Sequence, residues 1–226
     1  MTIVKVMQAA ALAAMVAVAA PALGQAYPTK PIRIVAPSTP GDAPGVIARL
    51  VADKLSAALG QQVVVDNKPG AGGVLGSESV AKSPPDGYTL IMGNAGSHGI
   101  NAAVYSKLPY DIQRDFAPVS RIGYGTIVLV VPSTLGASSV KELVALAKAK
   151  PGRLTFASSG TGALIHLTGE MFKHAAAIDI THVPYKGTTQ ILPDLLDGRV
   201  DMAVDSLPAY LPHIKSGKLR ALGVAS

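Results

Sequence analysis

The sequence has 226 residues, a formal net charge of +6, and neither cysteine nor tryptophan. A chain without cysteine holds no disulfide, no thiolate metal site and no amino-terminal lipid anchor. Its lysines and arginines are scattered and only 4% of its residues are aromatic, which argues against a nucleic-acid interface built from a basic stripe with stacking aromatics.

Residues 1–26 are predicted to be a cleavable secretory signal peptide. Lys5 precedes an apolar stretch from Val6 to Ala20, which is shorter than the ~20 residues needed to cross a bilayer. Small residues follow this stretch, and cleavage after Gly24 or after Ala26 fits them equally well. We therefore expect a soluble periplasmic protein.

Short runs rich in valine and isoleucine recur along the rest of the chain and predict strands. They lie at 32–36, 63–66, 89–92, 127–131, 155–157, 181–183, 202–204 and 219–224. Between them, apolar residues recur at helical spacing in four segments, which are 47–58, 140–147, 164–172 and 191–196. This alternation predicts an α/β fold with parallel sheets that carry helices on both faces.

The alternation is interrupted once, between residues 106 and 132, where two extended pieces meet at Gly123-Tyr124-Gly125 without an intervening helix. This interruption indicates a crossover between two lobes, 27–122 and 123–226, with a cleft between them. The chain ends in the middle of the last predicted strand, so we expect a truncated sequence with an incomplete second lobe.

Four loops rich in glycine, serine and threonine are the candidates for a ligand site. They are 37–45, 94–99, 158–162 and 185–189, two from each predicted lobe. In open parallel sheets, ligands bind beyond the carboxyl ends of the strands. Loops of this kind at helix starts expose N–H and hydroxyl donors, which favour anions such as carboxylates.

Ser97 offers an enzymatic alternative, a secreted α/β serine hydrolase. The stretch AGSHG, residues 95–99, differs from the G-x-S-x-G nucleophile elbow only at Ala95. However, His98 is adjacent in sequence and is expected to be badly placed as a base for Ser97, and nothing pairs another histidine with it.

The sequence contains no recognisable motif for binding a cofactor or a metal. The glycines at 70–76 lack the spacing of a dinucleotide-binding loop, and the five histidines lack H-x-x-x-H spacing. Nothing in the sequence places Asp42 and Asp205 together as an acid–base pair. We therefore expect neither a cofactor nor a metal.

Five stretches along the chain resemble the tripartite tricarboxylate transporter receptor family, also called Bug or TctC-like solute-binding proteins. They are YPTKPIRIVAPSTPGD, VVVDNKPGAGGVLGSESVAKSPPDGYTLIMG, LPYDIQRDFAPVS, ASSGTGALIHLTGEMFK and HVPYKGTTQILPDLLDGRVDMAVDSLPAYLPHIKSGKLRALGV. The resemblance implies a two-lobe periplasmic-binding-protein fold of the Venus-flytrap, type II-like kind. It also implies a monomer without enzymatic activity that closes on a small organic acid and delivers it to a membrane permease or to a sensor. Family members continue well past residue 226, through C-terminal helices that lobe 1 would then lack here.

The resemblance also implies a site, because in the family backbone amides, hydroxyls and ordered waters hold the ligand's carboxylate. Asp205 falls where the family has an aspartate beside the bound carboxylate. The positions that the resemblance assigns to the site are Ser38, Thr39, Gly41, Asp42, Gly96, Ser97, His98, Ser158, Ser159, Gly160, Thr161, Lys186, Gly187, Thr188 and Asp205. The sequence does not identify the acid.

The first loop departs from the family pattern P-F-P-P-G-G-x-x-D. Ser38 replaces the aromatic residue, Asp42 the second glycine, and Gly45 the last aspartate. An anion near Asp42 would meet like charge. Asp42 is therefore expected to accept a hydrogen bond from a ligand hydroxyl or amine, or to cap its own helix.

Overall fold

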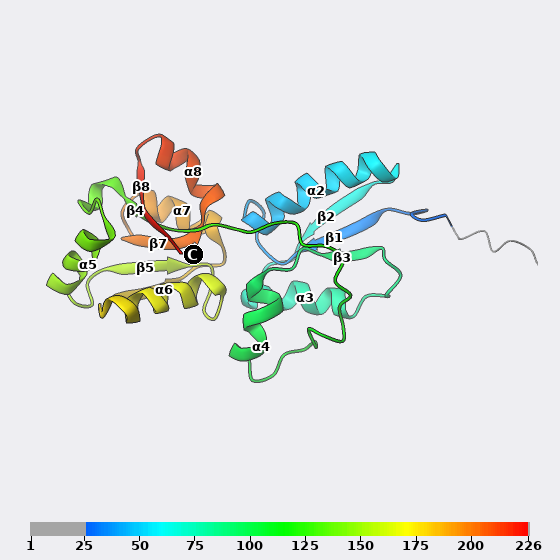
Figure 1. Cartoon of the computed structure of the whole chain (residues 1–226), viewed down its shortest axis with the longest axis horizontal. Helices are drawn as coiled ribbons and strands as arrows, with labels where there is room; N and C mark the ends of the chain where they lie inside the picture. The colour runs from blue at the N-terminus through cyan, green and yellow to red at the C-terminus, as the bar shows by residue number, and fades with distance from the viewer. Residues whose placement is uncertain (1–25, 226) are drawn as a thin grey trace, which may run out of the picture.

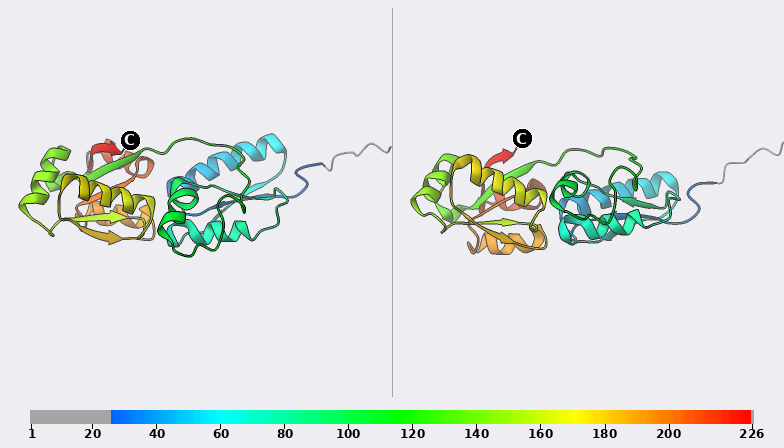
Figure 2. Two further views of the ribbon diagram at one scale, coloured as in Figure 1. Left: turned by 60° about the horizontal axis from the view of Figure 1, so that its bottom comes forward. Right: turned by 90° about the horizontal axis from the view of Figure 1, so that it is seen from below.

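The computed structural model describes residues 26–225, which form two lobes side by side (Figure 1). Each lobe is built on its own β-sheet, and residues 116–126, which have no regular secondary structure, run from one lobe to the other (Figure 2). The boundary predicted between residues 122 and 123 falls in this segment. The predicted signal peptide lies outside the described residues, apart from Ala26. In the described part of the chain, no helix combines the length and apolarity needed to span a membrane.

Lobe 1 contains a three-stranded parallel sheet with the order β2-β1-β3. Its strands are β1 (Ile32–Ala36), β2 (Val63–Asn67) and β3 (Thr89–Ile91). Its helices are α2 (Ala43–Leu59), η1 (Ala71–Gly73), α3 (Val74–Ala81), η2 (Gly96–Ile100) and α4 (Asn101–Val104). The core forms where Ala48 and Ala52 of α2 pack against Ile32 and Ile34 of β1.

Lobe 2 contains a five-stranded sheet with the order β6-β5-β7-β4-β8. Its strands are β4 (Ile127–Pro132), β5 (Thr155–Ser158), β6 (Thr181–Pro184), β7 (Met202–Ser206) and β8 (Leu219–Ala225). Its helices are η3 (Ser133–Leu135), α5 (Val140–Ala149), α6 (Leu164–Ala176), α7 (Thr188–Leu196) and α8 (Leu207–Lys215). Helices α5 and α6 cover one face of the sheet, and α7 and α8 cover the other, each over its own apolar core.

Every predicted strand and helix is present, but the prediction of parallel sheets holds only in part for lobe 2, where β5 is parallel to β6 and β7. Strand β4 is antiparallel to both of its neighbours, β7 and β8. It enters the lobe from the extended segment 116–126, with no crossover helix before it. Because only a strand–helix–strand crossover returns a strand in the parallel direction, nothing fixes β4 as parallel.

Gly169 allows α6 to lie close against β5. A Cβ atom at this position would lie 2.7 Å from Cδ2 of Phe156, whose side chain is fully buried. Overpacking of this kind costs about 1–3 kcal/mol, and alanine recovers about 1 kcal/mol through its helix propensity. Gly169→Ala is therefore expected to lower the free energy of unfolding by about 1 kcal/mol in urea denaturation. The same change should cost less in a Phe156→Leu background, and equal costs in both backgrounds would contradict this packing argument.

Candidate functional site

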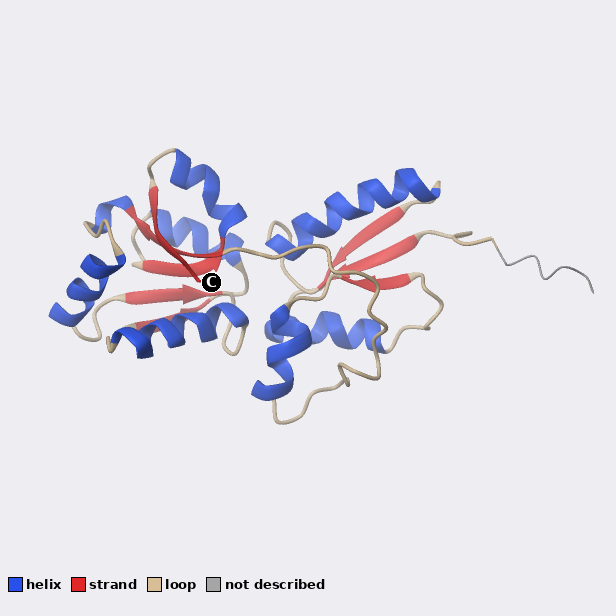
Figure 3. Ribbon diagram, in the orientation of Figure 1, coloured by secondary structure: helices blue, strands red, loops and turns tan. Residues whose placement is uncertain are grey.

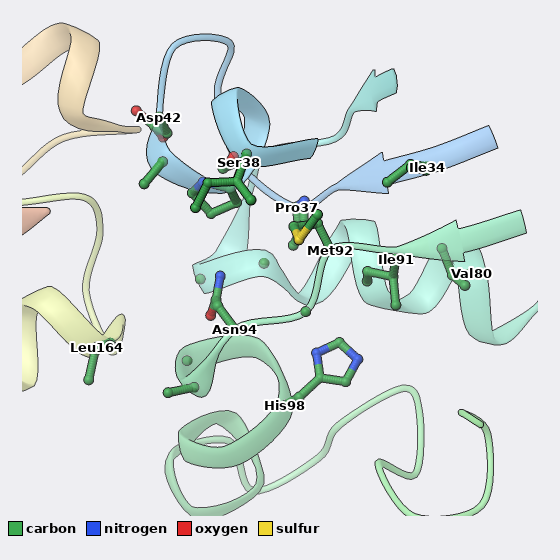
Figure 4. Close-up of a pocket in the computed structure, with 18 of the residues that line it drawn as sticks. Ile34, Pro37, Ser38, Asp42, Val80, Ile91, Met92, Asn94, His98 and Leu164 are labelled. Carbon is green, nitrogen blue, oxygen red and sulfur yellow. The ribbon is translucent and has the colours of Figure 1, made fainter. Parts of the chain in front are cut away.

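A cleft of about 1700 Å³ opens between the lobes and continues along lobe 1. Strands of both sheets run toward it, so the loops at their carboxyl ends form its walls (Figure 3). Pro37 and Ser38 follow β1, Asn94 follows β3, and Ser159 follows β5. The part of the wall that lobe 1 contributes is shown in Figure 4. The interlobe end includes polar residues such as Asp42 and Thr188, whereas the continuation along lobe 1 includes many apolar ones, such as Leu55.

Most of the residues assigned from the family resemblance lie in the cleft wall. These are Ser38, Thr39, Asp42, Gly96, His98, Ser159, Gly160, Thr161, Lys186, Thr188 and Asp205. Four assigned residues do not line the cleft, namely Gly41, Ser97, Ser158 and Gly187. The fold therefore brings all four predicted loops to one place, although it turns some of their side chains away.

A hydrogen-bonded network centred on Thr188 joins the two lobes. The Thr188 amide, at the start of α7, donates to Asp42 Oδ1 over 3.1 Å, and the Thr188 hydroxyl donates to Asp205 Oδ2 over 2.7 Å. Tyr210 also donates to Asp205 Oδ2, over 2.9 Å, and the Ser206 amide donates to Oδ1 over 2.7 Å. Sequence reasoning missed this link between Asp42 and Asp205.

Asp42 does not cap its own helix, so that part of its prediction is wrong. It occupies the N-cap position of α2, but its side chain makes no capping bond there. Its Oδ2 instead accepts a hydrogen bond from the Thr39 amide over 3.2 Å, and its Oδ1 faces lobe 2. Figure 4 shows the Asp42 side chain directed toward the neighbouring lobe.

Both carboxylates are buried without a cation. The pKa of Asp205 is raised to about 6, chiefly by burial and to a smaller extent by the nearby Asp42 charge. The hydrogen bonds from Thr188, Ser206 and Tyr210 oppose this rise. Burial also raises the pKa of Asp42. Among residues 26–225, no ion pair includes either side chain. This end of the cleft therefore contains two buried carboxyl groups that are not paired with a cation of the described residues.

The loop 158–162 is held by two neighbouring histidines that sequence reasoning did not pair. The rings of His166 and His182 lie 4.1 Å apart between centroids. His182 Nε2 is 2.6 Å from Ser158 Oγ, and the Gly162 amide donates to His166 Nδ1 over 3.1 Å. Burial, together with His166, lowers the pKa of His182. The Ser158 hydroxyl is thus engaged behind the loop, which leaves Ser159 and Thr161 facing the cleft.

Ser97 and His98 are closer than the sequence suggested. Ser97 Oγ lies 2.9 Å from His98 Nδ1, so the expectation that His98 is badly placed is wrong in distance. However, Ser97 is fully buried and also hydrogen-bonded to Asn94, and His98 Nε2 has no hydrogen-bond partner within residues 26–225. A hydrolytic triad would need a carboxylate at that nitrogen.

The cleft wall also includes residues outside the four predicted loops. Among them are Leu164, Gln190 and Ser206. Ser206 lies near the end of the predicted strand 202–204, and this position was the available signal. Within the described part of the chain, no group of three potential metal ligands is found.

Comparison with known proteins identifies relatives over most of the chain. Residues 47–226 match the family described as "Tripartite tricarboxylate transporter family receptor". The chain is 41% identical over 201 residues to the "UPF0065 protein in tcbD-tcbE intergenic region" of Pseudomonas sp. (strain P51), covering 89% of this chain and 60% of that one. It is 40% identical over 210 residues to BugT of Bordetella pertussis, covering 92% and 64%. The chain thus spans less than two thirds of these curated relatives.

Solved structures with the same fold include periplasmic proteins. One described as a periplasmic transporter superposes with a TM-score of 0.86 at 41% identity, covering 89% of this chain and 67% of that one. An R. palustris protein solved with adipate gives 0.85 at 40% identity, covering 88% and 67%. MatC from Rhodopseudomonas palustris, solved with bound malate, gives 0.82 at 30% identity, covering 88% and 68%. The expected two-lobe periplasmic-binding-protein fold is therefore confirmed.

Proposed function

Because this chain belongs to the tripartite tricarboxylate transporter receptor family, we propose that it is a solute-binding receptor that captures a small carboxylated metabolite between its lobes. The observation that carries this proposal is the convergence of donor-rich loops from both lobes on one cleft. Closure of the lobes would surround the ligand with these donors and exclude water.

The carboxylate is the ligand group that the loops suit best. Ser159, Gly160 and Thr161 lie in the cleft wall, in the loop that leads into α6, so amides and hydroxyls lie near the positive end of a helix dipole. Relatives solved with adipate and malate support a ligand of this class. The family assignments to the four loops and Asp205 remain part of this proposal.

The place of action that we propose is the periplasm, where the receptor passes its ligand to the membrane permease of a tripartite tricarboxylate-type transporter. The family description and the periplasmic relatives support this placement. The serine hydrolase alternative loses its support, because the family consists of binding proteins and because Ser97 is buried away from the cleft.

Calorimetric titration with adipate and malate tests the binding proposal. Ser159→Ala combined with Thr161→Ala is expected to weaken carboxylate binding at least tenfold, about 1.4 kcal/mol, because two hydroxyl donors are removed from the wall. The matched control is Thr134→Ala combined with Ser216→Ala, two exposed positions of lobe 2 outside the cleft, which should bind like the unmodified chain.

Two outcomes would count against the proposal. Unchanged affinity in the Ser159→Ala, Thr161→Ala variant would remove this loop from the site. Hydrolysis of an ester such as p-nitrophenyl acetate that is lost in Ser97→Ala would replace the receptor with an enzyme.

A further inference from the structure

The Asp42 carboxylate forms a hydrogen bond across the interlobe cleft. Asp42 precedes α2 in lobe 1, whereas Thr188 begins α7 in lobe 2. The Thr188 amide donates to Asp42 Oδ1 over 3.1 Å, and the two residues are 7% and 5% exposed. An anionic group of the chain itself therefore occupies a donor of the proposed carboxylate site.

The Thr188 amide is a favourable place for an anion. The first amides of a helix have no partner within the helix, and the helix dipole is positive there. A carboxylate accepting such an N–H makes a charge-assisted hydrogen bond, which is stronger than one between neutral groups. Burial keeps water from competing for this amide.

The hydroxyl of Thr188 cannot replace its amide as a donor to the ligand. The hydroxyl carries one hydrogen, which it donates to Asp205 Oδ2 over 2.7 Å. A ligand carboxylate that binds Thr188 must therefore take the amide that Asp42 holds. It would also approach two buried carboxylates, Asp42 and Asp205, that have no cation within ion-pair distance among residues 26–225.

We propose that Asp42 is an internal competitor for carboxylate ligands, which holds the α7 amide, ties the lobes together and must be displaced when a ligand carboxylate binds there. This proposal rests on the proposed function of the cleft. It makes Asp42 an affinity-setting residue, with the strongest effect on ligands that carry two negative charges.

The test compares the unmodified chain with Asp42→Asn and Asp42→Ala. Asparagine keeps the volume and one acceptor oxygen but removes the charge, whereas alanine removes the acceptor as well. Removal of Asp42 costs α2 no capping bond, because none is present. Asp53→Asn, at an exposed position of the same helix, makes the same change of charge away from the cleft and serves as the control.

Calorimetry with succinate, adipate and acetate gives the first readout. We expect both Asp42 variants to bind the dicarboxylates at least tenfold more tightly than the unmodified chain, with a smaller gain for acetate. Asp53→Asn should show no gain. Equal or weaker dicarboxylate binding by both Asp42 variants would overturn the competition.

The second readout is the distance between the lobes, which needs no ligand. The chain has no cysteine, so Lys54→Cys and Lys148→Cys place two fluorophores on exposed positions of α2 and α5. Energy transfer should fall in Asp42→Ala, because the tie is lost, and an unchanged value would overturn the tie. If no variant binds a carboxylate, the proposed function and the competition both fail. The distance between the lobes still shows whether the Asp42–Thr188 hydrogen bond holds them together.

Discussion

Replacing Gly187 by alanine is expected to weaken carboxylate binding about 100-fold, or about 2.7 kcal/mol, without unfolding the protein. A Cβ atom at position 187 would overlap the side chain of Thr39 and lie 2.8 Å from Asp42 Oδ2. Both contacts belong to lobe 1, so the added methyl group would hold the lobes apart. The backbone of Gly187 has a φ of 170°, which alanine also adopts, so the local fold of lobe 2 should be unaffected.

The size of this effect follows from the geometry of closure. A ligand held by donors of only one lobe loses the charge-assisted hydrogen bonds of the other, and each of these is worth about 1.5–3 kcal/mol. The loss should persist in an Asp42→Ala background, because the overlap with Thr39 remains there.

Calorimetry gives the affinity of Gly187→Ala, and thermal unfolding shows whether lobe 2 is intact. Gly99→Ala is the matched control, because a Cβ atom at Gly99 meets no atom within 4 Å. If Gly187→Ala bound as tightly as Gly99→Ala, the approach of loop 39–42 to position 187 would have no part in binding.

The fold was largely predictable because its periodic patterns report burial directly. Apolar runs such as 127–131 and 202–204 are strands in the middle of a covered sheet. The direction of β4 was not predictable. A run that is buried on both faces has the same composition whether its neighbours are parallel or antiparallel.

The candidate site was predictable as a set of loops but not as a set of contacts. Loops at the carboxyl ends of strands share one edge of a sheet, which brings Ser38 and Ser159 to the same cleft. The bond between Asp42 and Thr188 spans 146 positions and depends on how two lobes meet. The pairing of Ser158 with His182 depends on the register of β5 and β6. No local pattern encodes either contact.

Asp205 gives the second large prediction, a dependence of stability on pH. As pH rises from 4 to 7, the unmodified chain is expected to lose about 2 kcal/mol of unfolding free energy relative to Asp205→Asn. Burial raises the pKa of Asp205 to about 6 in the folded chain, against 3.8 for an ordinary aspartate. Between these values the folded chain binds the proton and the unfolded chain does not, so stability falls with rising pH and becomes level above about 6.

Comparison with Asp205→Asn isolates the pH effect of Asp205 from that of the other titratable groups. Exposed or half-buried carboxylates such as Asp86, Asp111 and Asp194, whose pKa values are lowered by hydrogen bonds and nearby cations, favour the folded state as pH rises. They are present in both proteins, so their effect cancels in the difference. Asparagine has only one acceptor oxygen and loses some of the bonds to Thr188, Ser206 and Tyr210, but that cost does not change with pH.

Urea denaturation at constant ionic strength, repeated at intervals from pH 4 to 8, gives the difference directly. Tyr210→Phe sharpens the test, because it removes a hydroxyl that donates to the charged form of Asp205 from a fully buried position. With that donor gone, the pKa of Asp205 should rise further, and the loss of stability should extend to higher pH. A difference between the unmodified chain and Asp205→Asn that stays flat from pH 4 to 7 would mean that Asp205 is solvated like an ordinary surface carboxylate, contrary to its burial beside Thr188 and Tyr210.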